Sequence, residues 1–250
     1  MNFLEIDRED GIATVTLVHG KVNAINERMV DELHECLTDL EQDRGISGMI
    51  LTGRGKFFSF GLDIPELFEY SRDRFRTFLE KFTALYTRMF LFRKPMVAAI
   101  NGHAIAGGCM LTLPADYRIM ASGKGRIALN EINLGSSVFA GSVAMLKQCT
   151  GVKSATKILK SGALFSAESA FEMKLVDKVV EPEDLYEEVQ NKVYEFAEKD
   201  ANAYGSIKRL IREPVAEQMI RYEPGSLDEF IDIWYSDNTR EKLRQVEIRS

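Results

Sequence analysis

The 250-residue chain contains few of the residues that cross-link a fold or ligate a metal, with three cysteines and three histidines. Cys36, Cys109 and Cys149 are an odd number at wide spacings and form no CxxC pair, which argues against a disulfide framework and a zinc site. They indicate free thiols in a reducing compartment. The histidines form no HExxH motif or paired-ligand spacing, so we expect no metal.

The chain also lacks an excess of positive charge and any long hydrophobic run. Its 32 Lys and Arg residues face 38 Asp and Glu residues, a formal net charge of −6. Nucleic-acid binding draws mainly on Lys and Arg, so we expect no nucleic-acid partner. No stretch approaches the roughly 18 apolar residues of a membrane span. Four of the first ten residues are acidic, whereas a leader peptide is apolar or Arg-rich there. We therefore expect no membrane association and a cytoplasmic location.

Strand-like runs alternate with amphipathic helices through about residue 130. Asp10-Gly11 separates two strand-like runs and predicts a hairpin. Asn26 has the position of an N-cap, and the helix that follows should end at Gly45. The run 96–100 is continuously apolar, as expected of a strand that is buried on both faces. This alternation predicts an α/β fold with one main core.

The last third of the sequence is mostly helical. We assign residues 1–199 to the main core and residues 200–250 to a helical C-terminal region that contributes to oligomer contacts. The only tryptophan, Trp234, lies in an apolar stretch there, which predicts a subunit contact. A helix expected over about 72–92 carries many aromatic side chains on one stripe. Core packing is the favoured interpretation of that stripe, and the wall of a lipid pocket is the alternative. We find no internal repeat.

Two glycine-containing turns, 57–65 and 101–109, each lie between a strand-like run and a probable helix. The start of a helix leaves backbone N–H groups without partners and carries a partial positive charge. Two such N–H groups that converge on one oxygen form an oxyanion hole. On composition alone, a tight strand-to-helix connection is the favoured interpretation of either turn, and an oxyanion hole is the alternative. Asp63, in the first turn, is the expected N-cap of the helix after it.

Glu131 is the candidate proton-transfer residue, because it follows an apolar strand-like run and has apolar neighbours. Burial among such neighbours raises the pKa of a carboxylate and suits it to proton transfer near pH 7. From these residues alone, however, a solvated glutamate at the end of a strand is the favoured interpretation.

The two turns and Glu131, in this order, resemble the crotonase (enoyl-CoA hydratase/isomerase) family. The resemblance implies a spiral of ββα units with a helical C-terminal region, assembled as trimers or dimers of trimers. It also implies an acyl-CoA thioester substrate, with coenzyme A as part of that substrate and no further cofactor. The resemblance covers most of the chain and is carried by segments 20–26, 58–64, 101–109, 115–119, 166–170 and 175–180.

The resemblance also implies residue roles. The N–H groups of Leu62 and Gly107 fall where the family forms its oxyanion hole, and Glu131 matches a catalytic glutamate. The residues that fall where the family holds the coenzyme A moiety are Lys21, Val22, Ala24, Phe60, Gly61, Leu62, Asp63, Ile64 and Gly107.

Two departures from the hydratase pattern bear on the reaction. Hydratases similar to this chain carry a second catalytic glutamate, which here is Met110, and a thioether cannot exchange protons at pH 7. Phe139 stands in the loop where hydratases usually have Pro-Gly-x-Gly-Gly, and its ring should exclude water from the substrate pocket. One carboxylate suffices to move a double bond from C3 to C2, as in the Δ3,Δ2-enoyl-CoA isomerase branch. The alternatives are a hydratase, an acyl-CoA hydrolase and a non-catalytic acyl-CoA binding protein.

Overall fold

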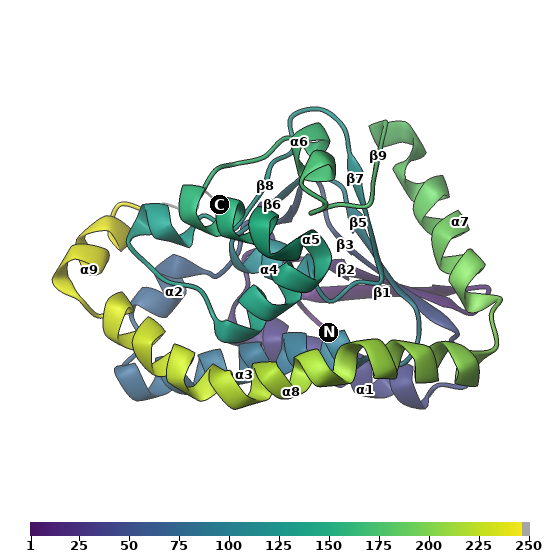
Figure 1. The fold of residues 1–250 in the computed structure, drawn as a ribbon, viewed down its shortest axis with the longest axis horizontal. Coiled ribbons are helices and arrows are strands. Elements are labelled where there is room, and N and C mark those ends of the chain that lie inside the picture. Colours follow the sequence, from purple (N-terminus) through teal and green to yellow (C-terminus); the bar gives the residue numbers. More distant parts are fainter. Residues whose placement is uncertain (247–250) are drawn as a thin grey trace.

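The computed structural model describes residues 1–246, whose strands form two sheets (Figure 1). The large sheet contains β1 (Leu4–Glu9), β2 (Ile12–Leu17), β3 (Gly48–Gly53), β5 (Met96–Ile100), β7 (Tyr117–Ala121) and β9 (Lys178–Val180), in that spatial order. The small sheet contains β4 (Phe57–Ser59), β6 (His103–Ile105) and β8 (Ile127–Ala128), also in that order. β1 and β2 pair antiparallel, and the other paired strands run parallel.

Helices follow and cover these strands. They are α1 (Glu27–Gln42), α2 (Ile64–Phe68), α3 (Arg72–Leu91), α4 (Gly107–Thr112), α5 (Ala140–Ser161), α6 (Ala167–Glu172), α7 (Leu185–Ala197), α8 (Ala201–Trp234) and α9 (Asp237–Leu243). Two 3₁₀ helices, η1 (Glu131–Leu134) and η2 (Pro182–Asp184), complete the described secondary structure. No helix within residues 1–246 is long and apolar enough to cross a membrane.

The chain places strands in the two sheets alternately. β3, β5 and β7 join the large sheet, and the strand after each of them, β4, β6 and β8, joins the small sheet before a helix follows. Three successive ββα units therefore stack along the parallel sheets, although the sequence has no visible repeat. The repeated feature is the path of the backbone, which different side chains can support.

The large sheet is buried on both faces around β5. Met96, Ala98 and Ile100 belong to the main core, together with buried residues of α1 and α3. Val97 and Ala99 point to a second cluster formed with α7. The prediction of a strand that is buried on both faces is confirmed, because every residue of β5 is buried.

Local signals in the first part of the sequence have the expected structures. Asp10 and Gly11 both have positive φ, 47° and 78°, in a hairpin turn. The side chain of Asn26 caps α1 by accepting the Met29 N–H at 3.0 Å. The predicted end of this helix at Gly45 is wrong, because α1 ends at Gln42. The extended backbone of the next residue already breaks the helix there.

The long helix α8 runs along one side of the molecule, beside α3 (Figure 1). The aromatic stripe of α3 is core, as favoured from the sequence. The interpretation of Trp234 as a subunit contact is wrong, since its own chain buries it. Only 2% of Trp234 is exposed, and its ring centroid lies 4.6 Å from that of Phe75 on α3.

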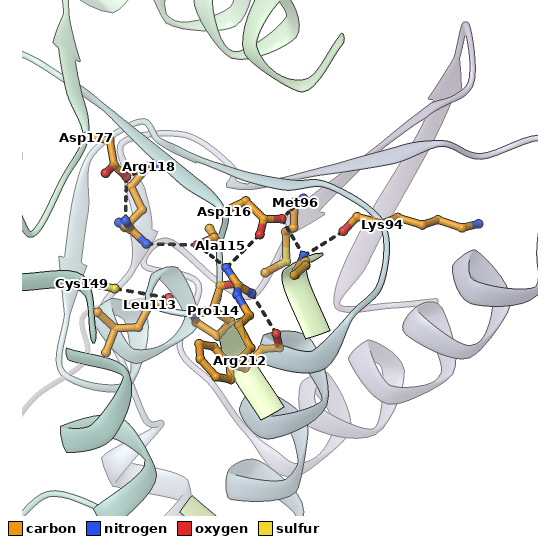
Figure 2. A network of polar contacts seen from close by, with 12 residues as sticks. Lys94, Met96, Leu113, Pro114, Ala115, Asp116, Arg118, Cys149, Asp177 and Arg212 are labelled. Atoms are coloured by element: carbon orange, nitrogen blue, oxygen red, sulfur yellow. Dashed lines mark hydrogen bonds and ion pairs between the residues drawn. The ribbon is translucent and has the colours of Figure 1, made fainter. Parts of the chain in front are cut away.

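A buried polar network fixes α8 to the end of the sheet (Figure 2). Asp116 accepts hydrogen bonds from Lys208 Nζ at 2.6 Å and from the Met96 N–H at 2.8 Å, and its other oxygen pairs with Arg212 at 2.8 Å. Burial lowers the pKa of Lys208 to about 8. α8 is thus anchored to the same core as the sheet. The domain boundary at residue 200 stays a prediction, and residues 247–250 of the C-terminal region lie outside the described residues.

Candidate active site

The two glycine-containing turns lie against each other at the ends of β4 and β6, which are paired strands of the small sheet. A Cβ atom on Gly108 would overlap the carbonyl oxygen of Ser59, and one on Gly61 would lie 2.8 Å from the carbonyl oxygen of Ile105. Only glycine lets the two backbones approach this closely. The contact between the turns therefore depends on Gly61 and Gly108. These glycines are far apart in the sequence, and no local sequence pattern indicates that they meet.

This approach brings the backbone amides of Leu62 and Gly107 together. The Leu62 nitrogen lies 3.4 Å from the position that a Cβ atom on Gly107 would occupy. Gly107 begins α4, directly after Ala106, whose φ of 50° and ψ of −119° are unusual for a residue with a side chain. Strained backbone of this kind is found preferentially at functional sites. Within residues 1–246, neither N–H has a hydrogen-bond acceptor.

The segment predicted to hold coenzyme A runs beside the first turn. The Phe60 N–H donates to the Val22 carbonyl at 3.0 Å, and the Ile25 N–H donates to the Gly61 carbonyl at 2.8 Å. Lys21 and Phe60 are exposed, and Val22 is half-buried. The Asp63 side chain accepts the Glu66 N–H at 3.2 Å, which confirms it as the N-cap of α2.

An apolar cavity of about 210 Å³ adjoins both turns. Leu62 and Gly107 line it, as do Phe60 and Ile64, whereas Lys21, Val22, Ala24, Gly61 and Asp63 do not. Of the described residues that line the cavity, Glu131 alone has an ionisable side chain. The structure thus brings the two amides and the candidate base to one cavity.

Glu131 is the first residue of η1, directly beyond the small sheet. Its side chain is 7% exposed, and within the described residues neither carboxylate oxygen has a hydrogen-bond partner. Burial raises the pKa of Glu131 from 4.5 to about 8. The interpretation favoured from the residues alone, a solvated glutamate at the end of a strand, is therefore wrong, and the interpretation of a buried carboxylate with a raised pKa is confirmed.

The profile described as enoyl-CoA hydratase/isomerase matches residues 7–249 of the sequence. The chain belongs to the enoyl-CoA hydratase/isomerase family. Its structure accordingly has the crotonase fold, as the resemblance implied. The crystal structure of human mitochondrial Δ3,Δ2-enoyl-CoA isomerase superimposes with a TM-score of 0.93 at 26% identity, over 97% of this chain and 95% of that one.

The chain is similar in sequence to relatives named as isomerases and to relatives named as hydratases. Mitochondrial enoyl-CoA delta isomerase 1 of Rattus norvegicus is 28% identical over 96% of this chain and 84% of its own length. The short-chain-enoyl-CoA hydratase of Clostridium acetobutylicum is 32% identical over 77% of this chain and 76% of its own length. Sequence identity therefore places the chain among enoyl-CoA hydratases and isomerases without choosing between them. The rat relative is named as mitochondrial, and the cytoplasmic location expected here stays a prediction.

Met110 and Phe139, the two departures from the hydratase pattern, both line the cavity of this crotonase fold and are about 1% exposed. The alternative interpretation of the helix at 72–92, as the wall of a lipid pocket, is wrong for this cavity, since no residue of that range lines it. The helix supports the wall from behind. The Phe139 ring lies 4.5 Å from Phe230 on α8 and 6.2 Å from Phe82 on α3, measured between centroids.

Reasoning from the sequence missed most of the cavity's far wall. Phe230 and Trp234 come from α8, and Leu243 and Val246 come from the C-terminal end of the described chain. Asn130 and Ser136, on either side of η1, were also not singled out. None of these residues lies in a motif of its own, because the wall forms only when α8 folds back across the site.

Proposed function

We propose that this protein shifts the double bond of a 3-enoyl-CoA from C3 to C2, with Glu131 as its single acid–base residue. The observation that carries the proposal is that Glu131 is the only ionisable side chain among the described residues of an otherwise apolar cavity. Hydration is helped by two carboxylates that position water, and Met110 stands where the second one would be. A proton shuttle between two carbons needs only one.

In the proposed reaction, ionised Glu131 removes a proton from C2 of the substrate. The electron pair left at C2 delocalises through the C3–C4 double bond and the thioester carbonyl, so negative charge develops on the thioester oxygen. The N–H groups of Leu62 and Gly107 donate hydrogen bonds to that oxygen. Glu131 then returns the proton at C4, which leaves the double bond between C2 and C3 and restores the carboxylate.

The geometry supports a large contribution from the two amides. Their N–H groups have no protein acceptor within residues 1–246, so they are free to bind a developing oxyanion. One donor of this kind contributes about 2.7–4 kcal/mol to transition-state stabilisation, and a positioned base contributes roughly 10²–10⁴-fold in rate. The amides should therefore matter at least as much as Glu131.

We place the coenzyme A moiety along the rim formed by Lys21 and Val22 and by the turn at Phe60–Ile64; Ala24, which the resemblance also implies, is 2% exposed and offers this rim little surface. The backbone hydrogen bonds between these two segments hold the rim beside the cavity mouth. Exposed Lys21 supplies a positive charge there for the phosphates of coenzyme A. The thioester then enters between the two amides, and the acyl chain occupies the cavity.

The test of this function is a side-by-side ultraviolet assay with 3-hexenoyl-CoA and crotonyl-CoA. We expect isomerisation of the first and little hydration of the second. Glu131→Gln should lose at least about 10²-fold in kcat/KM and keep acyl-CoA binding, because it removes the base and preserves the shape. Glu168→Gln, at an exposed position, is the matched control and should be fully active. An active Glu131→Gln variant would exclude the proposed shuttle.

Hydration is the second candidate, because the Clostridium acetobutylicum hydratase is 32% identical to this chain. Asn130 adds an unpartnered side-chain oxygen to the cavity, next to Glu131 in the sequence, where it could hold a water. Hydration of crotonyl-CoA at a rate similar to the isomerisation of 3-hexenoyl-CoA would favour this candidate.

We also propose that the chain assembles as a homotrimer or a dimer of trimers. Ile207, Leu210 and Ile211 on α8 are each more than half exposed, which is unusual for large apolar side chains on one helix. Sedimentation velocity at micromolar concentration should show a trimer or hexamer. A monomer under these conditions would contradict the proposal.

A further inference from the structure

Most of the unpartnered buried polar side-chain atoms among the described residues belong to residues that line one cavity. Among residues 1–246, six buried side-chain nitrogen or oxygen atoms have no hydrogen-bond partner. Five of them belong to residues that line the Glu131 cavity: Asn130 Oδ1, both Glu131 carboxylate oxygens, Ser136 Oγ and Trp234 Nε1. The sixth, Arg118 Nε, belongs to the polar network of Figure 2.

Proton transfer by Glu131 accounts for the two carboxylate oxygens, but it gives no role to Trp234 or Ser136. A buried tryptophan N–H usually finds a hydrogen-bond partner, and leaving it without one lowers stability. Trp234 is 2% exposed, so bulk water does not reach most of it. A purely aliphatic acyl chain in the cavity would leave this donor unsatisfied.

The indole of Trp234 is held rigidly. Its ring lies 4.6 Å from Phe75 and 6.0 Å from Phe230, measured between centroids, and both neighbours are buried. A hydrogen-bond donor held in one position favours ligands whose oxygen lies at one particular carbon of the acyl chain. Ser136 can rotate its hydroxyl to donate to the same kind of acceptor.

We propose that the acyl chain recognised by this cavity carries an oxygen acceptor, a keto or hydroxyl group, beyond the carbons that react. Trp234 Nε1–H donates a hydrogen bond to that oxygen, and the Ser136 hydroxyl is the second donor. This inference deepens the proposed function and rests on its acyl-CoA binding at the cavity, but not on the proton shuttle.

The size of the cavity limits the chain. Its volume of about 210 Å³ is below the roughly 300–1,000 Å³ that is typical of ligand pockets, which favours a short acyl chain. A six-carbon acyl chain with one oxygen is therefore a suitable probe. A keto oxygen is the better choice for a first test, since it only accepts and both proposed partners donate.

The experiment measures binding of saturated thioesters, which have no double bond to move. Isothermal titration calorimetry compares hexanoyl-CoA, 4-oxohexanoyl-CoA and 5-oxohexanoyl-CoA on the wild-type protein. We expect at least one oxo compound to bind roughly 5- to 100-fold more tightly than hexanoyl-CoA, because it satisfies a buried donor. Since Trp234 is the only tryptophan, its fluorescence reports independently whether the acyl chain enters the cavity.

Trp234→Phe is the decisive variant, as it removes the N–H and keeps an aromatic ring against Phe75. It should lose most of the preference for the oxo compound, measured as the ratio of its Kd for hexanoyl-CoA to its Kd for the oxo compound in the same variant. Ser136→Ala should reduce the preference in part, and it provides a second test if Trp234→Phe does not fold. Equal binding of all three thioesters to the wild type would overturn the proposal, as would a preference that survives in both variants.

Failure of the proposed function is distinguishable from failure of this inference. If hexanoyl-CoA binds but leaves the Trp234 emission unchanged, the cavity is not the acyl site and both ideas fall. If oxo compounds bind preferentially and Glu131→Gln still isomerises 3-hexenoyl-CoA, the inference stands and the single-glutamate mechanism is wrong.

Discussion

Replacing Glu131 by glutamine should stabilise the folded protein at high pH, at the expense of activity. The pKa of Glu131 is about 8 in the folded protein and 4.5 in its ordinary state, which unfolding restores. Between these two values the folded protein holds a proton that the unfolded chain has released. Stability therefore falls as pH rises from about 4.5 to 8, because only the unfolded chain, whose carboxylate is solvated, gains free energy by ionisation.

The size of the effect follows from the pKa difference. At 1.36 kcal/mol for each pKa unit, the wild type loses up to about 5 kcal/mol of unfolding free energy across this range through Glu131 alone. Glutamine does not titrate, so Glu131→Gln avoids this loss. The variant should match the wild type near pH 4.5 and exceed its stability increasingly up to about pH 8, by several kcal/mol at pH 9.

Urea unfolding of both proteins at pH 5 and pH 9, at one protein concentration, measures this difference. Glu168→Gln is the control, because its exposed carboxylate already faces water when the chain is folded. A stability difference between Glu131→Gln and the wild type that is the same at both pH values would refute the reasoning. Reduced stability of the variant at pH 9 would do so as well.

Two further substitutions test the framework of the site. Gly108→Ala adds a Cβ atom that overlaps the Ser59 carbonyl oxygen and displaces the neighbouring Gly107 amide. We expect kcat/KM to fall at least about 10²-fold. Gly225→Ala is the control and should keep full activity, because the space around Gly225 is open. Asp116→Asn leaves two cationic side chains of α8 buried without a counter-charge and should lower the free energy of urea unfolding by about 3–5 kcal/mol. Little change from Asp116→Asn would show that the network does not anchor α8.

Much of the local structure was readable from the sequence, because its signals act over a few residues. The hairpin at Asp10-Gly11 depends on two positive φ angles, and the start of α1 depends on one side-chain oxygen at Asn26. The burial of β5 was visible in its unbroken apolar run. The apolar neighbours of Glu131 drew attention to it, but only the family resemblance made it the candidate base, because the residues alone favoured a solvated glutamate.

Long-range contacts were not readable in this way. Trp234 has the same sequence context whether a partner subunit or α3 covers it, and only the folded chain shows that α3 does. The extended residue after Gln42 ends α1 earlier than the glycine pattern indicated. In the first case the covering residue, Phe75, is distant in the sequence. In the second case the backbone conformation of Asp43 ends the helix, and no local residue pattern indicated it.

The sequence by itself determined the α/β class, the main caps and strands, and the presence of one apolar-flanked glutamate, since each depends on residues close together in the chain. Tertiary structure alone decided that Leu62 and Gly107 line the same cavity as Glu131, together with Trp234 and Ser136, whose polar side-chain atoms are buried without partners among the described residues. The physical reason is that this cavity is walled by segments from Phe60 to Val246. Its shape and polarity exist only when α8 packs across the sheets.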